Sequence, residues 1–133
     1  MKSRPVGRLV VVIEDDPLVL EATGGLLRTW GCKVIAAESF GEAMAKLGKV
    51  GQRPDLIVCD YRLPQGPNGV DAIEAVRSAF QIPALLISGD ASLAVPDDGI
   101  GGCRLLHKPV KPETFRAVLE EALLQSAADA ARR

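Results

Sequence analysis

The sequence predicts a single α/β domain in which five short parallel β-strands alternate with helices, a doubly wound (βα)5 fold. Three observations carry this prediction. Short apolar runs alternate with segments of helical periodicity, the runs are too short to be helices, and most of them end on a charged or hydroxyl side chain. The length of 133 residues suits one domain with a buried core, which we expect to span residues 1–133 with a core of about 8–125.

The predicted strands are apolar runs bounded by charged or turn-forming residues. The clearest lies between Arg53-Pro54-Asp55 and Pro64-Gln65-Gly66-Pro67, two segments that favour loops. The five predicted strands are Leu9–Ile13, Val34–Ala37, Leu56–Cys59, Ala84–Ser88 and Arg104–His107.

The first predicted helix follows Asp16-Pro17, an N-cap residue and a proline at the first helical position. Gly31 suits the residue just past its end, near Trp30. Gly24-Gly25 weakens the helix in its middle, because glycine is a poor helix former. Its apolar stripe consists of Leu18, Ala22, Leu26 and Leu27.

The second helix opens with a capping box, Ser39 and Glu42, and is expected to run through Leu47, with a loop from Gly48 to Pro54. A third helix is expected between the strands that end at Cys59 and begin at Ala84. Its apolar positions are Val70, Ile73, Val76 and Phe80.

The fourth helix is expected to be only a stub. The stretch from Asp90 to Gly102 contains Pro96, Asp97-Asp98-Gly99 and Gly101-Gly102, which interrupt a helix. The last helix begins near Pro112 and has a clear apolar stripe, and its alanine-rich end is expected to fray. The stripe consists of Phe115, Val118, Leu119, Ala122 and Leu123.

Composition excludes several classes of protein. With 16 Lys+Arg and 17 Asp+Glu the net charge is −1, so there is no electrostatic footprint for nucleic acid. No apolar stretch is long enough to span a membrane or to form a signal peptide, so we expect no membrane contact by this chain. The three cysteines lack metal-binding spacing and are interpreted as core residues in a reducing compartment, which favours a cytoplasmic protein.

Polar side chains follow the predicted strands at the edge where parallel α/β sheets bind ligands. Glu14, Asp15 and Asp16 follow the first strand, Asp60 the third, Ser88 ends the fourth and Lys108 follows the fifth. Carboxylates gathered at one edge repel one another unless a cation is present. A hard divalent ion such as Mg²⁺, which prefers oxygen ligands, removes that conflict.

These residues, in this order and at these strand ends, resemble the receiver domain of two-component response regulators. The resemblance covers Leu9 to Leu124 and implies a flavodoxin-like three-layer sandwich with the parallel sheet order 2-1-3-4-5. The phrases Asp60-Tyr61-Arg62-Leu63-Pro64 and Leu105-Leu106-His107-Lys108-Pro109-Val110 resemble receivers attached to hybrid sensor histidine kinases. The resemblance leaves open an excised receiver or a free-standing regulator.

The resemblance also implies a role for each residue of the site. Asp60 would be the phosphoacceptor, and Mg²⁺ would be bound by Asp60, by Asp15, by Glu14 through water and by the backbone carbonyl of Arg62. Ser88 and Lys108 would receive oxygens of the phosphoryl group, and Lys108-Pro109 would be a cis peptide bond. Such a domain is not an enzyme in the usual sense, although it catalyses its own phosphorylation and dephosphorylation.

The implied partner is a sensor histidine kinase or a histidine phosphotransfer protein, because the chain has no ATP site and His107 lacks the helical context of a phosphodonor. The first predicted helix, beside the acids, is the expected docking surface. The sequence leaves homodimer formation open.

The chain departs from the family pattern at several positions. Leu105 stands where the family often has an aromatic residue that moves during switching, and the short fourth helix alters a face that many regulators use for output. We hypothesise that Arg62 and Asp90 pair across the site and change the lifetime of the phosphoryl group.

Other classes fit less well. A haloacid-dehalogenase-like phosphatase needs a second acid two residues after the first, where this chain has Arg62. A dinucleotide-binding domain needs a glycine-rich turn after the first strand, where this chain has three acids. Two alternatives stay open: a receiver fold that signals without phosphorylation and a phosphate sink without output.

Overall fold

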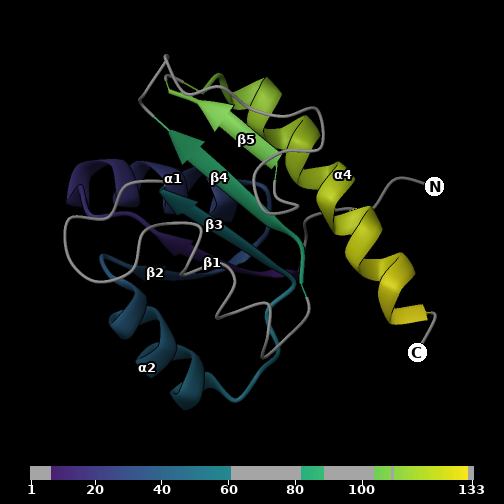
Figure 1. Cartoon of the computed structure of the whole chain (residues 1–133), viewed down its shortest axis with the longest axis horizontal. Helices are drawn as coiled ribbons and strands as arrows, with labels where there is room; N and C mark the ends of the chain where they lie inside the picture. Colours follow the sequence, from purple (N-terminus) through teal and green to yellow (C-terminus); the bar gives the residue numbers. More distant parts are fainter. Residues whose placement is uncertain (1–6, 61–81, 89–103, 109, 132–133) are drawn as a thin grey trace.

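The computed structural model describes residues 7–60, 82–88, 104–108 and 110–131, and it places a parallel β-sheet at the centre (Figure 1). The sheet has five strands in the order β2-β1-β3-β4-β5, which confirms the predicted fold class. The strands are β1 (Leu9–Ile13), β2 (Lys33–Ala37), β3 (Leu56–Asp60), β4 (Ala84–Ser88) and β5 (Arg104–His107). Each predicted strand is present, two of them longer by one residue.

Helices cover both faces of this sheet. The described helices are α1 (Pro17–Thr29), α2 (Phe40–Val50) and α4 (Pro112–Ala131). Successive side chains of a strand point to opposite faces, so each strand supplies both cores. Val11, Ile13, Ile57 and Cys59 pack with Ala43 and Leu47 of α2. On the other face, strand residues pack with α1 and α4 residues, among them Val10, Val12, Val58, Leu27, Phe115 and Leu119.

The first helix begins and ends as its sequence predicts. The side chain of Asp16 accepts hydrogen bonds from the backbone N–H groups of Leu18 and Val19. At the other end Gly31 has a φ of 90°, the amide of Cys32 bonds to Leu27 O, and the amide of Gly31 bonds to Arg28 O. This is a Schellman motif, which closes the helix and turns the chain into β2.

The second helix is longer than predicted. Ser39 and Glu42 do form the capping box, with Glu42 N–H donating to Ser39 and Glu38 N–H donating to Glu42. The expectation that the helix ends at Leu47 is wrong, because α2 continues to Val50 and ends at Gly51. Gly51 has a φ of 68° and takes the left-handed position that terminates the helix, so Gly48 is an interior residue.

The last helix starts at Pro112, as predicted, and is held to the end of α1 by aromatic contacts. The rings of Trp30 and Phe115 meet edge to face with centroids 5.7 Å apart, and the guanidinium of Arg116 lies 5.6 Å from the Trp30 ring centroid. These contacts join α1 and α4 on one face of the sheet. The predicted third helix, the fourth-helix stub, the Lys108-Pro109 bond, Cys103, Arg62 and Asp90 lie outside the described residues.

Candidate cation and phosphoacceptor site

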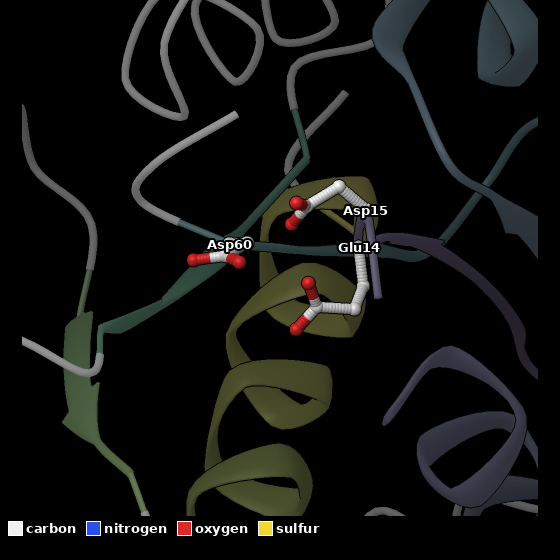
Figure 2. Close-up of side chains that lie close together, drawn as sticks. All are labelled: Glu14, Asp15 and Asp60. Atoms are coloured by element: carbon white, nitrogen blue, oxygen red, sulfur yellow. The ribbon is translucent and has the colours of Figure 1, made fainter. Parts of the chain in front are cut away.

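The register of the central strands brings the acids together. Ile13 of β1 pairs with Cys59 of β3, so the next residues, Glu14 and Asp60, lie side by side at the carboxyl ends of these strands. Glu14, Asp15 and Asp60 each offer a carboxylate oxygen, and these oxygens lie within 4.8 Å of one another. Figure 2 shows the three carboxylates directed toward a common space.

Among the residues that the structure describes, the ammonium group of Lys108 balances part of this charge. Lys108 follows β5, and its Nζ lies 2.9 Å from Oε1 of Glu14 and 3.5 Å from Oδ2 of Asp60. Burial by itself lowers the pKa of Lys108, but the hydrogen bond to Glu14 and the charges of Asp60 and Glu14 outweigh it, so the pKa is raised. Lys108 is therefore a firmly charged member of the cluster.

Glu14 is the most buried of the three acids, and both of its oxygens are engaged. One accepts from Lys108, and the other accepts from the backbone N–H of Asp16 at 3.2 Å. Its own amide donates to Ala37 O of β2. Glu14 thus links the loop after β1 to both the lysine and the neighbouring strand, while Asp15 and Asp60 are half-buried.

The fourth strand contributes a hydroxyl. Ser88 is 1% exposed at the carboxyl end of β4, which lies beside β3. Its backbone carbonyl accepts from the amide of Lys108 at 2.7 Å. The ends of β4 and β5, which carry the serine and the lysine, are therefore tied together by a short backbone bond.

The donor set fits a hard divalent cation. Carboxylate oxygens are the ligands that Mg²⁺ prefers, and one or two carboxylates with waters are its usual protein contribution. Asp15 and Asp60 have oxygens near one another, whereas both oxygens of Glu14 already accept hydrogen bonds. This geometry suits direct ligation by the two aspartates and an outer position for Glu14.

A groove of about 490 Å³ opens beside Lys108, between α1 and the start of α4. Its lining is mostly apolar. The residues are Val19, Ala22, Thr23, Leu26, Ile87, Lys108, Val110 and Phe115. The sequence did not predict this groove. The α1 residues and Phe115 are far apart in the chain, and no local sequence pattern indicates that they lie close together in the fold.

The remaining predictions near the site concern His107 and the cysteines. His107 is an exposed residue of β5, as its interpretation as a strand residue requires. Cys32 and Cys59 are buried and form no disulfide with described residues, in keeping with a role as core fillers. Burial, with the nearby charge of Asp55, raises the pKa of the Cys32 thiol.

The fold and site define a parallel α/β domain with an acidic cluster and a lysine at the carboxyl edge of its sheet. A family model, the response regulator receiver domain, matches residues 10–120. The chain belongs to this family.

Curated relatives agree with this membership. The chain is 29% identical over 119 residues to the phyllosphere-induced regulator PhyR of Methylorubrum extorquens, covering 86% of this chain and 43% of that protein. It is 27% identical over 131 residues to the two-component response regulator ORR24 of rice, covering 97% of this chain and 21% of that protein. The chain thus spans less than half the length of these relatives.

Solved structures show the same fold. The receiver domain of PhyR from Erythrobacter litoralis superposes with a TM-score of 0.76 at 26% identity, covering 90% of this chain and 92% of that one. A response regulator receiver protein from Sinorhizobium medicae superposes with a TM-score of 0.78 at 25% identity, covering 90% and 97%. No helix within the described ranges has both the length and the apolar character needed to cross a membrane.

Proposed function

We propose that this chain, residues 1–133, is a single phosphoacceptor receiver domain of a two-component phosphorelay, in which Asp60 takes a phosphoryl group from a phosphohistidine. The observation that carries the proposal is the convergence of Glu14, Asp15, Asp60 and Lys108 at one sheet edge. With the three carboxylates ionised, three acids and one lysine carry a formal net charge of −2, before the charge of a phosphoryl donor is counted. That is the situation which a divalent cation resolves.

The transfer is a displacement at phosphorus. An Asp60 carboxylate oxygen forms a bond to phosphorus while the phosphorus–nitrogen bond of the donor breaks. The electron pair of the broken bond stays on the imidazole nitrogen, and because the other ring nitrogen of the donor carries a proton, the leaving group is neutral imidazole. The product is an acyl phosphate on Asp60.

Bound Mg²⁺ would neutralise charge on the transferring phosphoryl group. Asp15 and Asp60 would hold the cation directly, with the backbone carbonyl of Arg62 as a third protein ligand and Glu14 acting through water. Glu14 also holds the amide of Asp16, and so fixes the loop that presents Asp15. Both oxygens of Glu14 already accept hydrogen bonds, so we do not place Glu14 among the direct ligands of the cation.

Lys108 and Ser88 would recognise the phosphoryl group once it is on Asp60. Lys108 lies 3.5 Å from Asp60 before any transfer, so its ammonium is already positioned beside the acceptor. Because the Lys108 amide bonds to Ser88 O, recruitment of the ammonium and of the hydroxyl would move the ends of β4 and β5 together. Such a shift biases a two-state arrangement of the surrounding loops, which is the signalling event.

The phosphodonor would be a sensor histidine kinase or a histidine phosphotransfer protein that docks on α1. The start of α1 lies directly after the acids, and its Leu18, which is 77% exposed, offers a partner an apolar contact beside them. We place this function in the cytoplasm, with no direct binding of nucleic acid or membrane by this chain.

Intact-mass measurement tests the proposal. The protein is incubated with acetyl phosphate as the donor, with Mg²⁺ or with a chelator, and the wild type is compared with Asp60→Asn. Asp16→Asn is the matched control, because it also removes one carboxylate near the site while asparagine still caps a helix.

We expect a gain of one phosphoryl group that requires Mg²⁺, persists in Asp16→Asn and is absent in Asp60→Asn. Absence of any gain in the wild type, with Mg²⁺ binding demonstrated, would instead support signalling without phosphorylation.

A further inference from the structure

We propose that α1 contains a hinge at Gly24-Gly25, about which its first half, residues 17–23, closes on the groove beside α4 and moves Asp15 relative to Asp60. Four features of the described structure support a hinge at this point. They are the two glycines, a side-chain bond at the same turn, the different anchoring of the two halves, and open space beside the first half.

The middle of α1 is intrinsically weak. Glycine costs about 1 kcal/mol relative to alanine in a helix interior, and here two glycines are adjacent. A Cβ built on Gly24 would lie 3.6 Å from the Val34 side chain and 3.3 Å from the tip of Arg28, so packing limits residue size there. A Cβ on Gly25 would meet nothing within 4 Å, so packing does not account for the second glycine.

A hydroxyl interferes at the same turn. Thr29 Oγ1 donates to the carbonyl of Gly25 at 2.9 Å, in competition with the helical backbone bond to that carbonyl. Bonds of this type bend helices and slightly destabilise them. The helix is therefore weakened at Gly24-Gly25 by two effects, the backbone entropy of glycine and the competing hydrogen bond from Thr29.

The two halves are anchored differently. The second half carries the fully buried Leu27, ends in the Schellman motif and is followed by Trp30, which packs on Phe115. Among residues 17–23 only Leu20 is buried. The second half is fixed to the sheet and to α4, whereas the first half has one buried contact residue.

The first half also borders open space. Val19, Ala22 and Thr23 face the groove of about 490 Å³, with Val110 and Phe115 on its opposite side. Closing this space would bury apolar surface, which favours the movement. The first half would carry Asp15 and Asp16 with it, because the Asp16 side chain caps α1 through the amides of Leu18 and Val19. Glu14 would stay in place, because it is bonded to Lys108 and to Ala37 of β2.

Hydrogen exchange by NMR tests the hinge without Mg²⁺ or a phosphodonor. The test variant is Gly25→Ala, which introduces no contact, and the matched control is Gly48→Ala, an open-space glycine inside α2. In Gly25→Ala we expect the amides of residues 26–28, whose helical bonds to the carbonyls of residues 22–24 cross the hinge, to exchange about fivefold more slowly, the ratio that ~1 kcal/mol of helix propensity predicts. The amides of residues 21–23, whose helical bonds lie within the first half, should be unchanged, and Gly48→Ala should alter neither group.

Equal slowing of residues 21–23 and 26–28 would show that α1 opens as one unit and would overturn the hinge. So would no slowing at residues 26–28.

The coupling to the acids rests on the proposed function and has its own measurement. Mg²⁺ should slow exchange of the amides of residues 26–28 in the wild type, and this response should be smaller in Gly25→Ala. An equal response in both proteins would overturn the coupling. If Mg²⁺ shifts neither the Asp15 nor the Asp60 amide resonance, the proposed cation site fails, whereas the hinge is still decided by the Mg²⁺-free comparison.

Discussion

Lys108 lies closer to Glu14 than to Asp60, with Nζ–O distances of 2.9 and 3.5 Å. Glu14 is 5% exposed, so this lysine is the cation that compensates a buried carboxylate. Asp60, the proposed phosphoacceptor, lies farther from the lysine than Glu14 does, and its side chain is the more exposed of the two. Lys108 thus makes its shorter contact with Glu14 and its longer contact with Asp60.

Removal of the ammonium should destabilise the protein when Mg²⁺ is absent. Lys108→Met leaves the Glu14 carboxylate without its cation, and we expect a loss of about 1–3 kcal/mol in the free energy of unfolding, moderated by partial exposure of the pair. Because the pKa of Lys108 is raised from 10.5, its contribution is complete below that pH and is lost only as pH rises through the raised value. Urea unfolding at neutral pH measures it.

The control for this prediction is Lys49→Met, at an exposed position of α2. Mg²⁺ should restore part of the stability lost in Lys108→Met, because it supplies positive charge to the same acids. A loss no greater than that of the control would contradict the role assigned to the lysine.

The capping box of α2 makes a prediction about pH. The backbone N–H of Glu38, followed by Lys46, lowers the pKa of Glu42 from 4.5. A lowered pKa stabilises the folded protein above pH 4.5, and this contribution is lost as pH falls through the folded-state value. Glu42→Gln should therefore cost about 0.5 kcal/mol at pH 7, a small value because the side chain is solvent-screened, and less at pH 3.

Denaturant unfolding of both proteins at the two pH values measures the difference. An effect of the same size at pH 3 and pH 7 would show that the charge of Glu42 is not what stabilises the capping box.

Asp55 should be structural although it lies only a few residues before the proposed acceptor. One oxygen accepts the amide of Leu9 at 2.9 Å, and the other pairs with Arg8 at 3.3 Å, which joins the starts of β1 and β3. Asp55→Ala leaves the Leu9 amide without this acceptor, so we expect a loss of about 1–3 kcal/mol. Arg8→Ala should cost less, because the ion pair itself is partly exposed.

Thermal and urea unfolding give these values, and phosphoryl incorporation gives the second readout. If Asp55→Ala abolished incorporation while folded, the assignment of Asp55 to structure alone would be wrong.

Local patterns determined much of the fold. The alternation of apolar runs with helical stripes predicts the five strands found here, and Asp16-Pro17 and Ser39 with Glu42 predict two helix starts. The acids could also be placed at one edge, because parallel strands all end on the same side of their sheet. Sheet order came from the family resemblance, since helical crossovers do not by themselves specify which strands are neighbours.

The remaining features depend on contacts between distant residues. Lys108 and Glu14 are 94 positions apart, and nothing in either local sequence predicts that the lysine would bond to Glu14 more closely than to Asp60. The groove arises where α1 meets Phe115. The end of α2 was misjudged because Gly48 and Gly51 are alike in sequence, and only the second adopts the left-handed conformation.

The most direct test of the account identifies the residue that carries the phosphoryl group. The Mg²⁺-loaded protein is treated with acetyl phosphate and then with borohydride, which reduces an acyl phosphate to an alcohol and leaves free carboxylates unchanged. Peptide mass mapping then locates the reduced residue. The account predicts reduction at Asp60 alone, dependent on Mg²⁺, and reduction at Asp15, at Asp55 or nowhere would contradict it.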